Sequence, residues 1–60
     1  MNSRLLRRWL VSLGVQMIEG SRHTKLYYQG KQSTLPRHTQ IPDVLVKAIL
    51  KQLGIVEPPP

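Results

Sequence analysis

The first fourteen residues carry a pattern typical of an amphipathic helix. Ser3 is expected to cap its N-terminus, and Gly14 to end it in the left-handed conformation. Arg4, Arg7 and Arg8 fall mainly on the polar face, which is either a contact surface for an anionic partner or a plain solvated surface. The apolar positions recur at the spacing of one helix face, namely Leu5, Leu6, Trp9, Leu10 and Leu13.

A second helix with the same spacing is predicted near the end of the chain. Pro42 suits the first helical position, Asp43 suits the positive end of the helix dipole, and Gly54 is expected to end the helix. We expect one domain over residues 1–56 and a proline-rich tail over residues 57–60. The apolar positions of this helix are Leu45, Val46, Ile49, Leu50 and Leu53.

Between the helices the pattern changes to the two-residue period of strands. Strands are predicted over 15–19, 23–28 and 32–35, joined by the turn Gly20-Ser21 and by a hairpin at Gln29-Gly30-Lys31. The alternation divides the last two strands into two faces. The core face is expected to carry Leu26, Tyr28, Ser33 and Leu35, and the polar face His23, Lys25, Tyr27, Gln32 and Thr34.

This order of elements predicts an α+β fold. Two helices with matching apolar faces and one sheet with a single apolar face bury those faces together as a two-layer sandwich in the order α-β-β-β-α. Both helices are then expected on one face of a three-stranded antiparallel sheet. The opposite face of the sheet would be open to solvent or to a ligand.

The amino-acid composition excludes several kinds of functional site. The chain has 60 residues and no cysteine, which excludes disulfides and thiolate nucleophiles. Its two histidines, His23 and His38, supply at most half of a metal site, so we expect no metal and no other cofactor. No apolar run reaches the length of a membrane span and no signal peptide is recognisable, so we expect a cytoplasmic protein with no membrane partner.

The charge balance indicates a polyanionic partner. Nine Lys and Arg residues face three Asp and Glu residues, for a formal net charge of +6. Residues 20–40 hold four of the cations and both histidines but no acid. Nucleic acid is the first choice of partner for such a chain, ahead of an acidic protein or a membrane surface.

An imidazole among cations suits one reaction in particular, the attack of an RNA 2′-hydroxyl on its own 3′-phosphate. The substrate supplies the nucleophile, and the protein supplies a base and positive charge. The turn Gly20-Ser21 presents His23 as that base. Lys25, Arg37 and His38 are candidates for the charge and for protonating the leaving group.

The alternative is that His23 is a surface residue of a non-catalytic RNA-binding module or, less in keeping with the sequence, of a basic DNA-binding protein. Lys31 at the hairpin tip is either a phosphate contact or a solubilising charge. Tyr27 either stacks on an unpaired base or only covers the sheet.

Several short motifs together resemble the HicA family of bacterial toxins. They are Gly20-Ser21-x-His23 before an alternating strand, the glycine hairpin, Leu35-Pro36-Arg37-His38, and a last helix reading from Lys47 to Gly54. The resemblance implies a fold similar to the double-stranded-RNA-binding domain, cleavage of mRNA, and His23 as the essential histidine. It also implies a HicB antitoxin partner that shields this histidine. Many members carry a second histidine where this chain has Arg22, which makes Arg22 a candidate phosphate contact.

Overall fold

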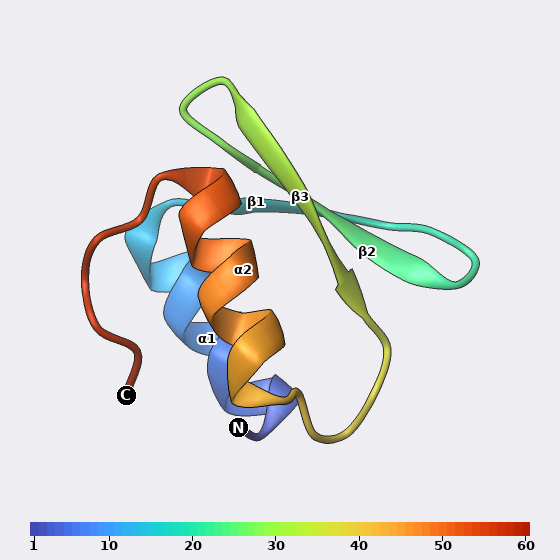
Figure 1. The fold of residues 1–60 in the computed structure, drawn as a ribbon. Coiled ribbons are helices and arrows are strands. Elements are labelled where there is room, and N and C mark those ends of the chain that lie inside the picture. Colours follow the sequence, from blue (N-terminus) through green and yellow to red (C-terminus); the bar gives the residue numbers. More distant parts are fainter.

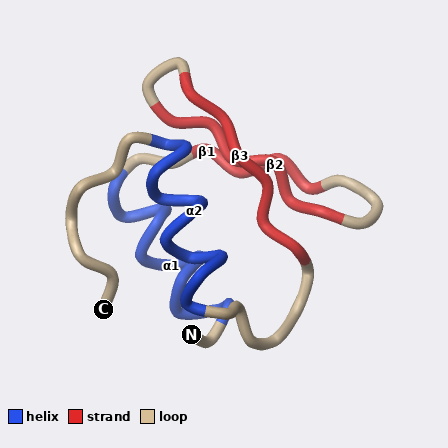
Figure 2. The backbone as a smooth tube through the Cα atoms, in the orientation of Figure 1, coloured by secondary structure: helices blue, strands red, loops and turns tan.

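The computed structural model describes residues 1–60 and has the predicted order of elements. Both helices lie on one side of the sheet (Figures 1 and 2). The prediction of an α-β-β-β-α sandwich is therefore confirmed. The elements are α1 (Ser3–Leu13), β1 (Gln16–Glu19), β2 (His23–Tyr28), β3 (Lys31–Pro36) and α2 (Asp43–Leu53).

The three strands form an antiparallel sheet in the order β1-β2-β3. The β2–β3 turn has positive φ at Gln29 (49°) and Gly30 (80°), the backbone that a tight hairpin requires, and Lys31 already belongs to β3. Leu26 and Leu35 are fully buried, whereas His23 and Lys25 are exposed. The predicted division of the sheet into a core face and a polar face is thus correct.

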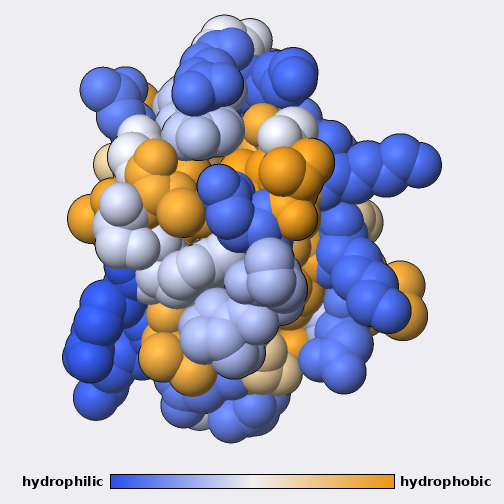
Figure 3. All heavy atoms as spheres, turned by 90° about the vertical axis from the view of Figure 1, so that its left-hand side faces the viewer, coloured by the Kyte–Doolittle hydropathy of each residue, from blue (hydrophilic) through white to orange (hydrophobic).

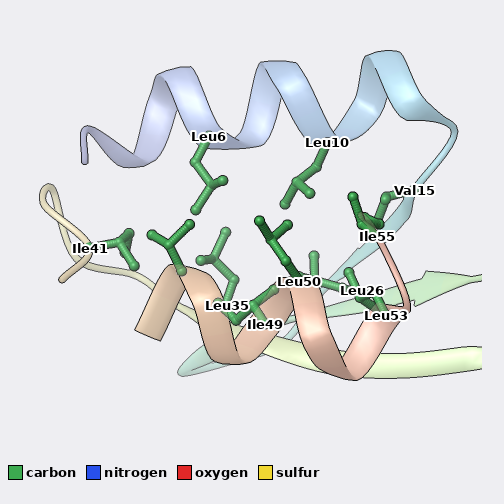
Figure 4. Close-up of a cluster of buried hydrophobic side chains, with 11 residues drawn as sticks. Leu6, Leu10, Val15, Leu26, Leu35, Ile41, Ile49, Leu50, Leu53 and Ile55 are labelled. Atoms are coloured by element: carbon green, nitrogen blue, oxygen red, sulfur yellow. The ribbon is translucent and has the colours of Figure 1, made fainter. Parts of the chain in front are cut away.

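The core fills the space between the sheet and the two helices (Figure 4). Leu5, predicted for the core face of α1, is 44% exposed and lies outside this core, whereas Trp9 and Leu13 are partly buried against it. Ile41, which the sequence pattern did not single out, is fully buried. The core consists of Leu6, Leu10, Val15, Leu26, Leu35, Ile41, Val46, Ile49, Leu50, Leu53 and Ile55.

Both helices end in the same way. Gly14 (φ 100°) and Gly54 (φ 72°) adopt the left-handed conformation that glycine reaches without strain. The amide after each glycine donates back into the last helical turn, from Val15 to the Leu10 carbonyl and from Ile55 to the Leu50 carbonyl. This reversal places Val15 and Ile55 in the core, so Val15 follows the cap of α1 and precedes β1, which begins at Gln16.

The cap of α1 differs from the prediction. Asn2, and not Ser3, caps the helix, because its Oδ1 accepts hydrogen bonds from the amides of Arg4 (2.8 Å) and Leu5 (3.2 Å). The Ser3 amide instead donates to the carbonyl of Thr39 at 2.9 Å, which joins the start of α1 to the β3–α2 loop. At the start of α2, Pro42 occupies the N-cap position and not the first helical position.

The exposed large apolar side chains are dispersed. On the face shown in Figure 3, hydrophobic residues form separate patches between polar residues. The large apolar side chains that are exposed come from α1, β1, α2 and the segment after α2. These side chains are Leu5, Val11, Ile18, Val44 and Val56.

One carboxylate links α1, the sheet and the β3–α2 loop. Glu19, at the end of β1, accepts hydrogen bonds from Arg7 Nη1 of α1 (3.3 Å) and from Arg37 Nη2 (3.4 Å), and it also accepts from the Thr24 hydroxyl of β2. Arg7 Nη2 donates in turn to Thr24 Oγ1 at 2.7 Å. The fully buried Thr24 hydroxyl is therefore satisfied as both donor and acceptor.

These contacts lower the pKa of Glu19. The largest cause is the hydrogen bond from Thr24, followed among the lowering effects by the hydrogen bond from Arg7 and the charges of Arg7 and Arg37, while desolvation opposes them. Because the folded-state pKa lies below the unfolded one, the ionised carboxylate stabilises the fold above the unfolded pKa. That contribution is lost as the pH falls through the folded-state pKa.

We predict that Glu19→Gln removes a pH-dependent part of the stability. Glutamine keeps an oxygen that accepts from Thr24 but has no charge for the two arginines. The thermal midpoint of the variant should lie below that of the wild type at neutral pH, and the gap should close as the pH falls below about 4.3, the ordinary range of a glutamate. Thermal unfolding followed by circular dichroism from pH 7 to pH 3 measures this difference.

Glu57→Gln is the matched control, because Glu57 is exposed and has no ion-pair partner in the fold. Its unfolding midpoint should track the wild type at every pH. A constant gap between Glu19→Gln and the wild type down to pH 3 would contradict the role given to the Glu19 charge.

Candidate functional site

The turn between β1 and β2 fixes the position of His23. The Gly20 amide donates to the His23 carbonyl at 2.9 Å, so the chain reverses across Ser21 and Arg22. A Cβ on Gly20 would lie 2.7 Å from that carbonyl oxygen, closer than real Cβ atoms approach backbone. Only glycine fits this turn without displacing the first residue of β2.

The side chains around His23 line one open hollow of about 420 Å³ that has no hydrophobic residue in its wall. Lys25 lies two residues after His23 on the same exposed face of β2 and is paired across the sheet with Thr34. Arg22 adds a second cation from the turn. The wall is formed by Gly20, Ser21, Arg22, His23, Lys25 and Thr34.

Two of the predicted site residues belong to a different hollow. Arg37 and His38 follow β3 and line a separate polar space of about 320 Å³, together with Arg4 and Arg7 of α1. Pro36 is the strand partner of His23, so Arg37 follows directly after the residue opposite the histidine. The two hollows are therefore neighbours, but they do not share wall residues.

Lys31 lies at the other end of the sheet. Its strand partner Tyr28 lies five positions after His23 on β2, a distance of roughly 17 Å along the strand. Its side chain lies against Gly54, where a Cβ would come within 2.5 Å of the Lys31 Nζ. The negative C-terminal end of the α2 dipole stabilises a cation at this place. Lys31 is thus not brought together with His23.

Sequence reasoning missed the residues that connect these parts. The helical spacing predicts Arg7 on the polar face of the first helix, whereas its side chain is only 27% exposed and binds Glu19 and Thr24. Glu19 is the first of the three acids of a basic chain and directly precedes the Gly20 turn. An isolated acid at this position is the sequence feature that indicates an ion pair with one or more of the arginines. The arginines that bind it are identified only by the structure.

The structure contains no group of three or more His, Cys, Asp or Glu side chains placed to hold a metal ion. None of its helices has both the length and the apolar character needed to cross a membrane.

Known proteins match this chain over most of its length. The family model described as the HicA toxin of bacterial toxin-antitoxin systems matches residues 3–55. A probable mRNA interferase HicA 1 of Photorhabdus laumondii is 53% identical in an alignment of 51 residues that covers 82% of this chain and 90% of that protein. A probable mRNA interferase toxin HicA of Escherichia coli K12 is also 53% identical, over 82% of this chain and 88% of its own length.

A solved structure agrees with the fold. A chain in the crystal structure of the E. coli HicAB toxin-antitoxin complex superposes with a TM-score of 0.81 and 49% sequence identity, over 92% of this chain and 98% of that chain. Since the family model spans nearly the whole chain and the relatives match about half of its residues, this chain belongs to the HicA family of bacterial toxins.

Proposed function

We propose that this protein is the toxin of a type II toxin-antitoxin pair and an endoribonuclease that cleaves mRNA, with His23 as the catalytic residue. Its relatives are named probable mRNA interferases, which supports the activity. The observation that carries the assignment to His23 is its exposed position in a hollow that has a purely polar wall and two further cations, Arg22 and Lys25. No other exposed histidine is joined to the sheet in this way.

In the proposed reaction the RNA 2′-oxygen bonds to the adjacent phosphorus as the bond from phosphorus to the 5′-oxygen breaks. His23 accepts the proton of the 2′-hydroxyl. Arg22 and Lys25 stabilise the extra negative charge on the phosphoryl oxygens. The departing 5′-oxygen takes up a proton, for which Lys25 in the same hollow is a donor. The products are a 2′,3′-cyclic phosphate and a 5′-hydroxyl, and no metal or small-molecule cofactor takes part.

The partner we propose is a HicB-type antitoxin. The structural relative comes from a toxin-antitoxin complex, which supports such a partner. The polar face of the sheet carries His23 and Lys25 and is covered by no helix of this chain, so a partner can mask both at once. The site of action is the cytoplasm, where mRNA and antitoxin are both present.

We predict that His23→Ala abolishes cleavage without unfolding the protein, since His23 is exposed and contributes nothing to the core. Loss of a general base lowers the rate by about 100- to 10,000-fold. Induced wild-type protein should arrest growth and produce new mRNA ends that carry 5′-hydroxyls, whereas the variant should do neither. Primer extension, with a 5′-phosphate-dependent ligation as the second readout, measures these ends.

RNA binding separates catalysis from the alternative, a non-catalytic RNA-binding module of the same fold. His23→Ala should still bind an RNA oligonucleotide within a few-fold of the wild-type affinity, since backbone contacts from the other cations remain. Growth arrest by both proteins without new mRNA ends would overturn the assignment of a nuclease and favour the binding module.

We predict that Gly20→Ala impairs cleavage by moving His23. Because the added methyl meets the His23 carbonyl, we expect a loss of about 1–3 kcal/mol in unfolding free energy and a fall in cleavage rate beyond what unfolding explains. Gly30→Ala is the control, since its positive φ disfavours alanine at a hairpin tip remote from His23. Rates are compared on purified proteins below both unfolding transitions, and equal rates would show that the Gly20 turn does not position the histidine.

A further inference from the structure

A second cationic hollow lies where the start of α1 meets the β3–α2 loop. It measures about 320 Å³ and has no hydrophobic residue in its wall. Its wall contributes three guanidinium groups and an imidazole, but no carboxylate. The wall is formed by Asn2, Ser3, Arg4, Arg7, Arg37, His38 and Thr39.

The walls of this hollow are held in place by contacts within the fold. The backbone joins its two sides through the hydrogen bond from the Ser3 amide to the Thr39 carbonyl and through the pairing of Asn2 with Gln40. Glu19 binds the guanidinium groups of both Arg7 and Arg37 from outside the wall. Two of the three arginines therefore do not need to be ordered by a ligand, which lowers the entropic cost of binding.

The arginines retain positive charge and free donors. Three guanidinium groups less the one Glu19 carboxylate leave a local charge of +2. A guanidinium has five N–H donors; Arg7 uses two of them and Arg37 one within the chain. Arg4 has no side-chain hydrogen bond or ion pair at all. Such a set suits an oxyanion that accepts several hydrogen bonds, as phosphate does.

The hollow lies close enough to His23 for its oxyanion to be a phosphate of the same RNA strand. Pro36 is paired with His23, and paired Cα atoms lie at most about 5.5 Å apart. Arg37 is one residue further on, so its Cα lies no more than about 9.3 Å from that of His23. An RNA strand whose scissile phosphate lies at His23 can therefore reach the hollow with a neighbouring part of its backbone.

We propose that this hollow binds a second, non-scissile phosphate of the RNA strand that is cleaved at His23. This inference rests on the proposed ribonuclease function and adds a subsite to it. The subsite holds backbone charge and carries no chemistry. It therefore contributes to RNA affinity and to the alignment of the strand, and it favours substrates long enough to span both hollows.

Arg4→Gln tests the proposal, because this side chain lines the hollow without a structural partner. Arg8→Gln is the matched control, since it removes the same charge from the same helix at an exposed residue outside the hollow. Each is measured as a purified protein for cleavage kinetics and, in a His23→Ala background, for binding of a labelled single-stranded RNA of about twelve nucleotides by fluorescence anisotropy over a series of salt concentrations.

We expect Arg4→Gln to weaken RNA binding about 5- to 30-fold. The slope of log affinity against log salt should fall by about 0.7, as for one lost phosphate contact on a single strand. KM should rise by a similar factor with kcat nearly unchanged. Arg8→Gln should match the parent protein in all three measurements.

Equal RNA affinity and equal salt slopes for the two variants would overturn the subsite. If Arg4→Gln instead weakened only the complex with the antitoxin, the hollow would be a protein-binding site and the proposal would also fail. Neither result touches the nuclease itself, whose failure is recognised separately by the absence of new mRNA ends after induction of the wild-type protein.

Discussion

The arrangement of this small protein depends on the Glu19 carboxylate and the groups that bind it. Glu19 ends β1, yet it binds Arg7 of α1, Thr24 of β2 and Arg37 beyond β3. These contacts join the helix layer to the sheet and to the β3–α2 loop. Glu19 also immediately precedes Gly20, so the same anchor holds the base of the turn that presents His23. A single acid thereby fixes the turn of one hollow and two arginines of the other.

Placing this network at the surface has a physical reason. The Glu19 side chain is 55% exposed, so water screens its ion pairs and each adds little to the free energy of unfolding. Burying the same charges would carry a large desolvation penalty, which the surface position avoids. The hydrophobic core supplies most of the stability of the sandwich, and in 60 residues that core has only eleven members. The network acts on geometry instead: it orders guanidinium groups that would otherwise be free to move, and it satisfies the buried hydroxyl of Thr24.

Most of the fold could be predicted from periodicity, because the helix and strand patterns and the glycine stops agree with one another. The wrong predictions concern the N-cap of α1 and the burial of Leu5, where the local sequence is compatible with more than one arrangement. Asn2 and Ser3 are both good N-caps, and the backbone pairing of Ser3 with Thr39 decides for Asn2. Leu5 fits the apolar face by spacing, yet that edge of α1 faces neither the sheet nor α2 closely enough to bury it.

The candidate site was less predictable, since side chains distant in sequence build it. Nothing local in the chain says that Arg7 turns toward β1 or that Arg37 and His38 lie beside Arg4 rather than beside His23. The local signal was sufficient only for the Gly20-Ser21-Arg22-His23 turn, where four successive residues determine the geometry.

Separating the cations into two hollows also suits the proposed chemistry. Holding the RNA backbone and transferring a proton make different demands on a site, because the first needs fixed donors and the second needs a base that can reach the 2′-hydroxyl. The hollow around His23 contains the exposed cations Arg22 and Lys25, whereas the two arginines that Glu19 binds, Arg7 and Arg37, line the other hollow. The RNA strand is then held mainly in the hollow of Arg4, Arg7 and Arg37, where no proton moves, and the hollow around His23 stays open for the proton transfers. In a domain too small to enclose its substrate, cations spaced along the RNA backbone can hold the scissile phosphate in position beside the base.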